Sequence, residues 1–241
     1  MAELRFFFGT MGSGKSTQAL QIRHNLTARG LSVLLTTQLD RQVGKVSSRL
    51  GVAAEAEIVD PSVDLFRMAQ QVQLTCGLDA MICDEAQFYE PRQIEQLSHV
   101  VDHIGVDVYA FGLLTSFQGE LFPGTARLLE LADVRSELQV EARCWCGARA
   151  THNARIVNGQ QVYTGALKVV GDTAVDEPDE MHEVRYELMC RRHWHDGLHH
   201  IRGDQLELDI TDAARPGPDG APRPVVLRDV SEATSVDALR S

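Results

Sequence analysis

The residues from Gly9 to Thr17 have the types and spacing of a loop that binds phosphate. They read Gly9-Thr10-Met11-Gly12-Ser13-Gly14-Lys15-Ser16-Thr17, which fits the pattern G-x-x-x-x-G-K-[ST]. The glycines let successive backbone N–H groups point at phosphate oxygens, Lys15 adds a positive charge, and Ser16 can bind Mg²⁺. A chance glycine-rich turn is the alternative, but an apolar run at 4–8 and a helical pattern at 17–26 supply the context that the motif requires. The loop therefore predicts binding of a nucleoside triphosphate.

Two acidic residues, Asp84 and Glu85, follow a second apolar run at 80–83. In nucleotide-binding sheets a carboxylate at the end of a neighbouring strand can hold Mg²⁺ beside the phosphate loop, and Asp84 suits that role. Glu85 is expected at the carboxyl end of the sheet, where it could accept a proton from an attacking hydroxyl or water. The alternative is a solvated pair that only begins a loop. With the phosphate loop, the pair predicts phosphate transfer or hydrolysis, which leaves an ATPase, a GTPase and a small-molecule kinase open.

Cysteine and histidine residues form two close pairs late in the chain. The pairs are Cys144 with Cys146, and Cys190 with His193. Three thiolates and one imidazole from two turns can close a tetrahedral zinc site, which would stabilise a small module with little core of its own. Unbound buried thiols are the alternative. Cys76 and Cys83 fit helix and strand patterns and are expected in the core. His195, His199 and His200 could substitute as metal ligands, but a solvated cluster after the site is expected.

Short apolar runs and amphipathic stretches alternate over the first 140 residues. Strands are expected at 3–8, 32–36, 79–84 and 106–112, and helices at 15–29, 62–75, 91–103 and 122–132. This alternation predicts a P-loop NTPase-type α/β domain over 1–140, with a parallel sheet and helices on both faces. A second, cysteine- and histidine-rich module is expected over 141–203, with a hairpin at Asn158-Gly159 and an acidic loop at 173–183. The segment 211–241 is expected to be disordered.

The composition narrows the classes of partner. The chain has 241 residues, of which 44% are apolar and 24% charged, as in a soluble globular protein. Its net charge of −11 argues against a nucleic-acid polymer as partner. No apolar run approaches the roughly 20 residues of a membrane span, and no export signal is recognisable. We therefore expect a cytoplasmic protein without a membrane partner, whose five cysteines are metal ligands or buried thiols rather than disulfides.

The phosphate loop, the strand end Asp84-Glu85-Ala86-Gln87-Phe88 and the late Cys/His module together resemble the cytosolic-type (type II) thymidine kinases, over residues 3 to about 195. The resemblance implies that ATP and Mg²⁺ bind at the loop and that Asp40-Arg41 lies near the phosphates. It implies that Glu85 activates the 5′-hydroxyl of thymidine and that the late module is a zinc-anchored lasso closing over the nucleoside. The residues implied to contact the nucleoside are Phe88, Phe117, Phe122, Asn153, Arg155, Val169, Val170, Gly171, Asp172 and Tyr186.

The phenylalanines of this set could equally be ordinary core residues, above all Phe122 in its helical pattern. The chain also departs from the family pattern at three places. Arg143 stands where the first cysteine of a C-x-x-C pair would fall, the lasso is longer around 173–183, and Ser48-Arg49 replaces Ser-His. These departures concern the zinc geometry and the lasso, and they leave Lys15, Asp84 and Glu85 untouched.

The expected activity is therefore ATP- and Mg²⁺-dependent phosphorylation of thymidine to dTMP, with ADP as the second product. The resemblance also implies feedback inhibition by dTTP and a homo-oligomer, a tetramer. Two other classes stay open: a different P-loop ATPase or small-molecule kinase, and a zinc-containing nucleotide sensor without catalysis. The first predicts ATP turnover indifferent to thymidine, and the second predicts nucleotide binding without product.

Overall fold

A computed structural model describes residues 1–38, 45–47, 51, 53–138, 141–167 and 184–197. The chain divides into two compact units, Met1–Leu198 and His199–Ser241, and the second lies wholly outside the described residues. The acidic loop at 173–183, the tail at 211–241 and several residues with expected roles also lie outside the described part of the chain. These residues are Asp40, Arg41, Val169, Val170, Gly171 and Asp172. The division into domains at 1–140 and 141–203 stays a prediction.

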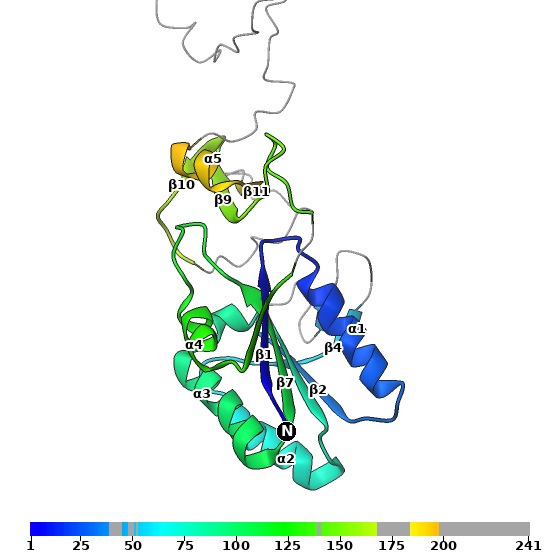
Figure 1. Cartoon of the computed structure of the whole chain (residues 1–241). Coiled ribbons are helices and arrows are strands. Elements are labelled where there is room, and N and C mark those ends of the chain that lie inside the picture. The colour runs from blue at the N-terminus through cyan, green and yellow to red at the C-terminus, as the bar shows by residue number, and fades with distance from the viewer. Residues whose placement is uncertain (39–44, 48–50, 52, 139–140, 168–183, 198–241) are drawn as a thin grey trace, which may run out of the picture. The chain divides into compact units, whose positions relative to one another are not determined.

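A six-stranded, all-parallel sheet forms the centre of the first unit (Figure 1). Its order is β5 (Glu57–Ile58), β2 (Val33–Thr37), β6 (Ala80–Asp84), β7 (Asp107–Leu113), β1 (Leu4–Gly9) and β8 (Val134–Glu137). The four expected strands are confirmed to within a residue or two, while the short edge strands β5 and β8 were not predicted. The predicted α/β fold with a parallel sheet is therefore confirmed.

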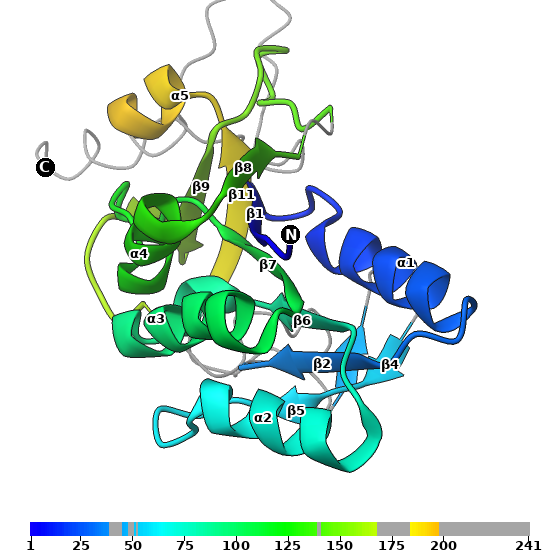
Figure 2. The ribbon, with the colours of Figure 1, turned by 60° about the horizontal axis from the view of Figure 1, so that its bottom comes forward.

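Helices cover both faces of this sheet (Figure 2). They are α1 (Lys15–Thr27), α2 (Leu65–Cys76), α3 (Pro91–His99), which continues as a π-helical turn Val100–Ile104, and α4 (Pro123–Leu131). Ile82 of β6 packs with Leu20 of α1, whereas its neighbours Met81 and Cys83 pack with α2, α3 and α4. Successive strand residues point to opposite faces, so one strand serves both cores.

The helix ends follow the local sequence. Asp64 caps α2, because its carboxylate accepts a hydrogen bond from the backbone N–H of Arg67 at 3.0 Å. Pro91 opens α3, as expected, and Glu90 and Gln93 form a capping box around it. Cys83 is buried as predicted, but the prediction for Cys76 was wrong: it is exposed at the last residue of α2.

The late module contains a three-stranded antiparallel sheet in the order β10 (Gln160–Val162), β9 (His152–Val157) and β11 (Val184–Met189), followed by α5 (Arg191–Asp196). The predicted hairpin at Asn158-Gly159 is confirmed. Both residues have positive φ, 49° and 76°, as a tight turn between twisted strands requires. A separate two-stranded sheet joins β3 (Lys45–Ser47) and β4 (Ala53–Glu55).

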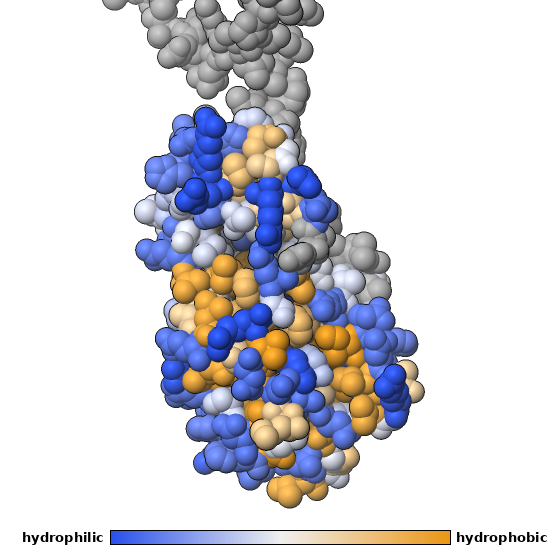
Figure 3. Space-filling view, viewed as in Figure 1, coloured by the Kyte–Doolittle hydropathy of each residue, from blue (hydrophilic) through white to orange (hydrophobic). Residues whose placement is uncertain are grey.

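Among the described residues, no helix is both long and apolar enough to cross a membrane. On the face shown in Figure 3, hydrophobic and hydrophilic residues are interspersed.

Candidate active site and metal cluster

The phosphate loop curls between the end of β1 and the start of α1. Gly12 and Gly14 adopt positive φ, 72° and 81°, a conformation that side chains other than glycine rarely take. A Cβ on Gly9 would lie only 2.9 Å from the Ser13 Cβ, which cannot rotate away, so the tight curl also favours glycine there. Lys15 is buried, and its Nζ donates a hydrogen bond to the Thr10 carbonyl at 2.8 Å. The loop thus already surrounds a positive charge.

Asp84 is the last residue of β6 and reaches this loop. We expected its strand to lie directly beside β1, but β7 lies between β6 and β1. Asp84 is only 3% exposed, and its side chain interacts with the Ser16 side chain of the loop. Burial and the adjacent Glu85 charge raise the pKa of Asp84 to about 7, against the opposing effects of Ser16 and Lys15. The structure therefore brings Lys15, Ser16 and Asp84 together.

One oxygen of Asp84 makes this group suitable for a cation. Among the described residues, Asp84 Oδ1 is buried without a hydrogen-bond partner. An unpaired buried carboxylate oxygen is costly, and a hard cation such as Mg²⁺ prefers oxygen ligands of this kind. Asp84 and the Ser16 hydroxyl are thus a fitting donor set for Mg²⁺.

Glu85 follows directly in an unusual backbone conformation. Its φ and ψ are 54° and 33°, in the left-handed region, and it precedes a 3₁₀ turn, Ala86–Phe88. Such conformations are disfavoured for non-glycine residues and concentrate at functional sites. The turn re-aims the chain at the carboxyl edge of the parallel sheet, where Gly9, Asp84 and Leu113 end their strands. Glu85 is therefore placed at the edge where open α/β sheets bind ligands.

Two of the predicted aromatic residues meet beside this turn. Phe88 and Phe122 form an edge-to-face pair with ring centroids 5.3 Å apart. They border a cavity of about 490 Å³ lined by Gln87, Phe88, Tyr89, Glu90, Pro91, Arg92, Phe122, Pro123 and Leu167. This volume suits a small organic ligand, and aromatic walls suit a planar ring. Neither Lys15 nor Glu85 is among the lining residues.

Phe117 lies apart from that cavity lining and contacts the late module. The Arg155 guanidinium lies over its ring at 5.2 Å, and Trp194 Nε1 donates a hydrogen bond to its carbonyl at 3.2 Å. Trp194 was not predicted as a site residue. Its ring lies so close to Gly119 that a Cβ there would approach it to 2.4 Å, a tertiary contact with no signature in the local sequence.

The remaining described candidates lie in the sheet of the late module. Asn153 and Arg155 belong to β9, and Tyr186 of β11 pairs in register with Arg155. Asn153 is buried, and its Oδ1 accepts a hydrogen bond from the backbone N–H of Met11 at 2.8 Å. The structure thus places Asn153 against the phosphate loop, a contact that the sequence did not indicate.

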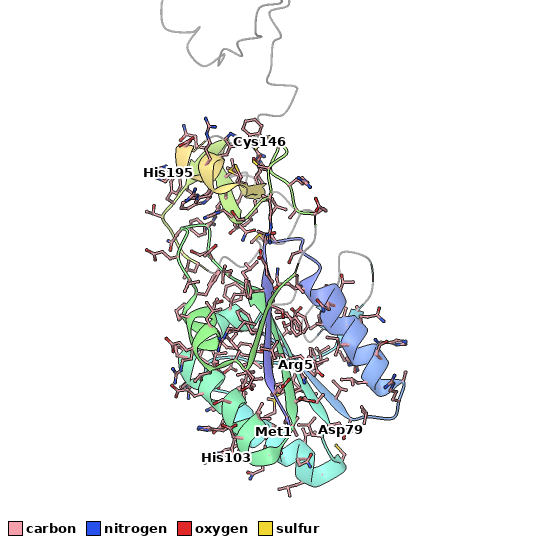
Figure 4. The ribbon with its side chains drawn as sticks, viewed as in Figure 1. Met1, Arg5, Asp79, His103, Cys146 and His195 are labelled. Atoms are coloured by element: carbon pink, nitrogen blue, oxygen red, sulfur yellow. The ribbon has the colours of Figure 1, made fainter. Side chains whose placement is uncertain are left out.

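The four predicted metal ligands come together at one point. The side-chain donor atoms of Cys144, Cys146, Cys190 and His193 all lie within 4.8 Å of one another. His193 Nδ1 is 3.3 Å from the sulfur of Cys144 and 3.6 Å from that of Cys190. Three thiols and an imidazole in this arrangement match the donor set of a structural zinc site. Figure 4 labels Cys146 near α5 and also His195, whose side chain is 82% exposed and stands outside the cluster.

The shortened C-x-C spacing is accommodated by a tight turn. Gly147 donates its backbone N–H to the Cys144 carbonyl at 2.8 Å, and Cys144 donates its own to the Ala148 carbonyl at 2.9 Å. Gly147 has a φ of 84°, which closes this turn. The exposed ring of Trp145 stacks on His193 with centroids 4.2 Å apart. The missing residue between the cysteines therefore does not prevent both thiols from reaching the cluster.

Comparisons with known proteins agree with this geometry. The family model described as "Thymidine kinase" matches residues 2–194. A thymidine kinase of Streptomyces coelicolor is 54% identical over 195 residues, covering 80% of this chain and 88% of that protein. One of Cutibacterium acnes is 46% identical over 200 residues, covering 82% and 90%, and one of Ruegeria pomeroyi is 39% identical over 198 residues, covering 80% and 94%. The chain belongs to the thymidine kinase family.

Proposed function

We propose that the chain transfers the terminal phosphoryl group of ATP to the 5′-hydroxyl of thymidine, giving dTMP and ADP. The observation that carries this proposal is the continuity of Asp84 and Glu85. Asp84 interacts with Ser16 of the phosphate loop, and Glu85 follows in a left-handed backbone conformation at the same sheet edge. A candidate base and a phosphate cradle therefore belong to one site.

The phosphate loop serves the ATP end of the reaction. Its backbone N–H groups and Lys15 bind the phosphates and stabilise the charge that spreads over the transferred group. Lys15 then exchanges the Thr10 carbonyl for phosphate oxygens. Ser16 and Asp84 would hold Mg²⁺, which would supply positive charge to the phosphates. Asp40 and Arg41 are assigned to the phosphates by family resemblance alone.

Glu85 serves the acceptor end. Its carboxylate orients the 5′-hydroxyl and takes its proton as the new P–O bond forms. The rings of Phe88 and Phe122 give the pyrimidine an apolar wall. Phe117, Asn153, Arg155 and Tyr186 are not among the residues that line the cavity beside these rings, and they are assigned to the nucleoside by family resemblance alone. The remaining assignments are Val169, Val170, Gly171 and Asp172, whose backbone groups would read the base edge.

Zinc in the cluster would tie Cys144 and Cys146 to Cys190 and His193, the two ends of the lasso. The three-sulfur, one-nitrogen donor set supports zinc over harder metals. A lasso fixed at both ends can close over a nucleoside with less loss of entropy than a free loop. We further propose a cytoplasmic tetramer inhibited by dTTP.

The test is phosphorylation of a nucleoside panel by the purified chain with ATP and Mg²⁺, following the 5′-monophosphates directly. Product is expected from thymidine, with little from cytidine, adenosine or guanosine. Glu85→Gln should lower turnover by at least about 100-fold while ATP still binds, since a general base contributes 10²–10⁴-fold. Glu95→Gln, at an exposed glutamate of α3, is the matched control and should keep full turnover.

Three outcomes would contradict the proposal. ATP consumption without a nucleotide product would indicate a different ATPase, and product from another alcohol alone would indicate a different kinase. Nucleotide binding without any turnover would indicate a sensor.

A further inference from the structure

Gln87 is a buried polar residue whose side chain links two parts of the site. It is only 1% exposed. Its Oε1 accepts a hydrogen bond from the backbone N–H of Leu113, the last residue of β7, at 3.0 Å. Its Nε2 donates a hydrogen bond to Oε2 of Glu85. One amide therefore connects the carboxyl end of a central strand to the carboxylate that follows the neighbouring strand.

The orientation of this amide is fixed by its partners. A backbone N–H can only donate, so the side-chain oxygen must face Leu113 and the NH₂ group must face Glu85. An amide donor orients a carboxylate without cancelling its charge, whereas an ammonium or guanidinium group would form an ion pair with it. A carboxylate held by Gln87 stays able to accept a proton.

Two glycines allow the turn that carries Gln87 to pack this closely. A Cβ on Gly112 of β7 would lie 2.8 Å from Gln87 Oε1 and 3.1 Å from its backbone nitrogen. A Cβ on Gly124 of α4 would lie 2.8 Å from the Ala86 carbonyl oxygen and 2.9 Å from that of Gln87. The 3₁₀ turn is therefore packed from both sides, by β7 and by α4.

The backbone of Glu85 gives a reason for such support. Its φ of 54° is disfavoured for a residue with a side chain, and such a conformation persists only where the surroundings hold it. A carboxylate on a flexible two-carbon stem also needs a partner to stay in one orientation. Gln87 supplies a side-chain partner and is itself anchored to the sheet.

We propose that Gln87 is a positioning residue that holds the Glu85 carboxylate in the orientation needed to accept the proton of the substrate hydroxyl. This inference rests on the proposed function, in which Glu85 is the base. Gln87 acts through Glu85 and makes no contact with the reacting atoms. Its loss therefore lowers kcat and leaves the KM for ATP and the KM for thymidine nearly unchanged.

The experiment replaces Gln87 by methionine, which keeps the length and removes both hydrogen bonds. Gln93→Met is the matched control, because Gln93 is also fully buried and its amide also bridges backbone groups, the N–H of Glu90 and the carbonyls of Asp60 and Val63. We expect kcat to fall about 10- to 100-fold in Gln87→Met, the range for displaced catalytic groups and their supports, and to stay within twofold in Gln93→Met.

A double-mutant cycle separates positioning from a general structural role. In the Glu85→Gln background, Gln87→Met should change the residual rate, followed with radiolabelled thymidine, by less than twofold. An equal fold-loss in both backgrounds would overturn the proposal, and so would a wild-type kcat in folded Gln87→Met. If Gln87→Met fails to fold by circular dichroism, Gln87→Glu takes its place. It keeps the acceptor for Leu113 and sets a second carboxylate against Glu85, so kcat should again fall by at least 10-fold, and an unchanged kcat would overturn the proposal.

The two proposals fail differently. If the wild-type chain makes no dTMP, the proposed function fails before any variant is compared. If the wild type is active, Glu85→Gln is impaired and Gln87→Met retains kcat, only the positioning role of Gln87 fails.

Discussion

The side-chain oxygen of Asn153 accepts a hydrogen bond from the backbone N–H of Met11, with 2.8 Å between the two atoms. Met11 lies in the phosphate loop, and Asn153 lies in β9, whose partner strand β11 ends immediately before Cys190. A buried strand next to the metal cluster therefore supplies an acceptor to the loop that is proposed to bind ATP. We predict that this contact couples metal occupancy of the cluster to nucleotide binding at the loop.

We expect metal removal to weaken ATP binding through this hydrogen bond. Loss of the metal loosens β9 and β11, and the Met11 amide then loses its fixed acceptor, so the loop is less well organised before ATP arrives. A coupling of this kind typically changes affinity by about 5-fold or more. The measurement is the Kd of a non-hydrolysable ATP analogue by calorimetry, before and after the cluster's metal is removed by chelation, with Mg²⁺ restored to the same concentration in both samples.

Asn153→Ala provides the test of the route. In this variant chelation should change the Kd for the analogue much less than in the wild type, because the connecting hydrogen bond is already absent. Gln160→Ala, at an exposed residue of β10, should behave as the wild type does. An equal response of Asn153→Ala and the wild type to chelation would rule out this hydrogen bond as the connection.

The buried carboxylate of Asp84 should lower the free energy of unfolding, although the same group is proposed to hold Mg²⁺. Its folded pKa of about 7 lies above the unfolded value of about 3.9, so the folded state binds more protons between these values. The free energy of unfolding therefore falls as the pH rises from about 4 to 7, and the full penalty remains above pH 7. Asp84→Asn removes the charge, keeps an oxygen for Ser16, and should stabilise the Mg²⁺-free protein at pH 8 by more than about 1 kcal/mol.

Urea unfolding at pH 5 and pH 8 in Mg²⁺-free buffer measures this effect. The gain from Asp84→Asn should be large at pH 8 and small at pH 5, while the same variant loses turnover. Asp102→Asn, at an exposed carboxylate, should leave the urea unfolding curves at both pH values unchanged. A variant equally stable or less stable than the wild type at pH 8 would contradict the predicted penalty.

The fold could be predicted from sequence wherever hydrophobic periodicity was strong. The four apolar runs became β1, β2, β6 and β7, but β8 was missed because its sequence Val-Arg-Ser-Glu has no apolar run. As an edge strand it is half exposed, and only backbone pairing with β1 defines it. The prediction that Cys76 lies in the core was wrong for the opposite reason. It continues the helical spacing of Leu65, Ala69 and Val72, but it is the last residue of α2, where packing against the core has ended.

The candidate site could be predicted as far as local motifs extend. The loop around Lys15, the pair Asp84-Glu85 and the metal cluster are contiguous or closely paired in the chain. The contacts of Asn153 with Met11 and of Trp194 with Phe117 join residues 142 and 77 positions apart. Such contacts depend on tertiary packing and leave no spacing in the sequence that could reveal them. The left-handed backbone conformation of Glu85 could not be predicted either, because the position is not occupied by glycine or asparagine, the residues that usually adopt it.

Zinc content should depend on the cluster and on no other cysteine. The purified chain is expected to hold about one zinc ion, since a three-sulfur, one-nitrogen set completes a tetrahedral site. Cys190→Ser should lose the metal during dialysis against a weak chelator, whereas Cys76→Ser, at an exposed cysteine outside the cluster, should retain it. Metal analysis by mass spectrometry gives the answer, and equal zinc in both variants would contradict the assignment of Cys190.

Gly124→Ala should destabilise the protein, although helix propensity alone predicts that alanine is more stable than glycine at this position. Gly124 lies in the first turn of α4, where alanine normally stabilises a helix by up to about 1 kcal/mol over glycine. Here a Cβ would lie 2.5 Å from the carbonyl oxygen of Tyr89 and within 2.9 Å of those of Ala86 and Gln87, all backbone atoms that cannot rotate away. Either α4 or the turn after Glu85 must therefore move. We expect the free energy of unfolding to fall by about 1–3 kcal/mol, the usual cost of overpacking, together with a lower kcat because the turn directly follows Glu85. Ala126→Gly in the same helix is the control, because urea unfolding of this variant measures the effect of helix propensity alone. A Gly124→Ala variant that is more stable than the wild type and fully active would show that the turn is not packed against α4 as described.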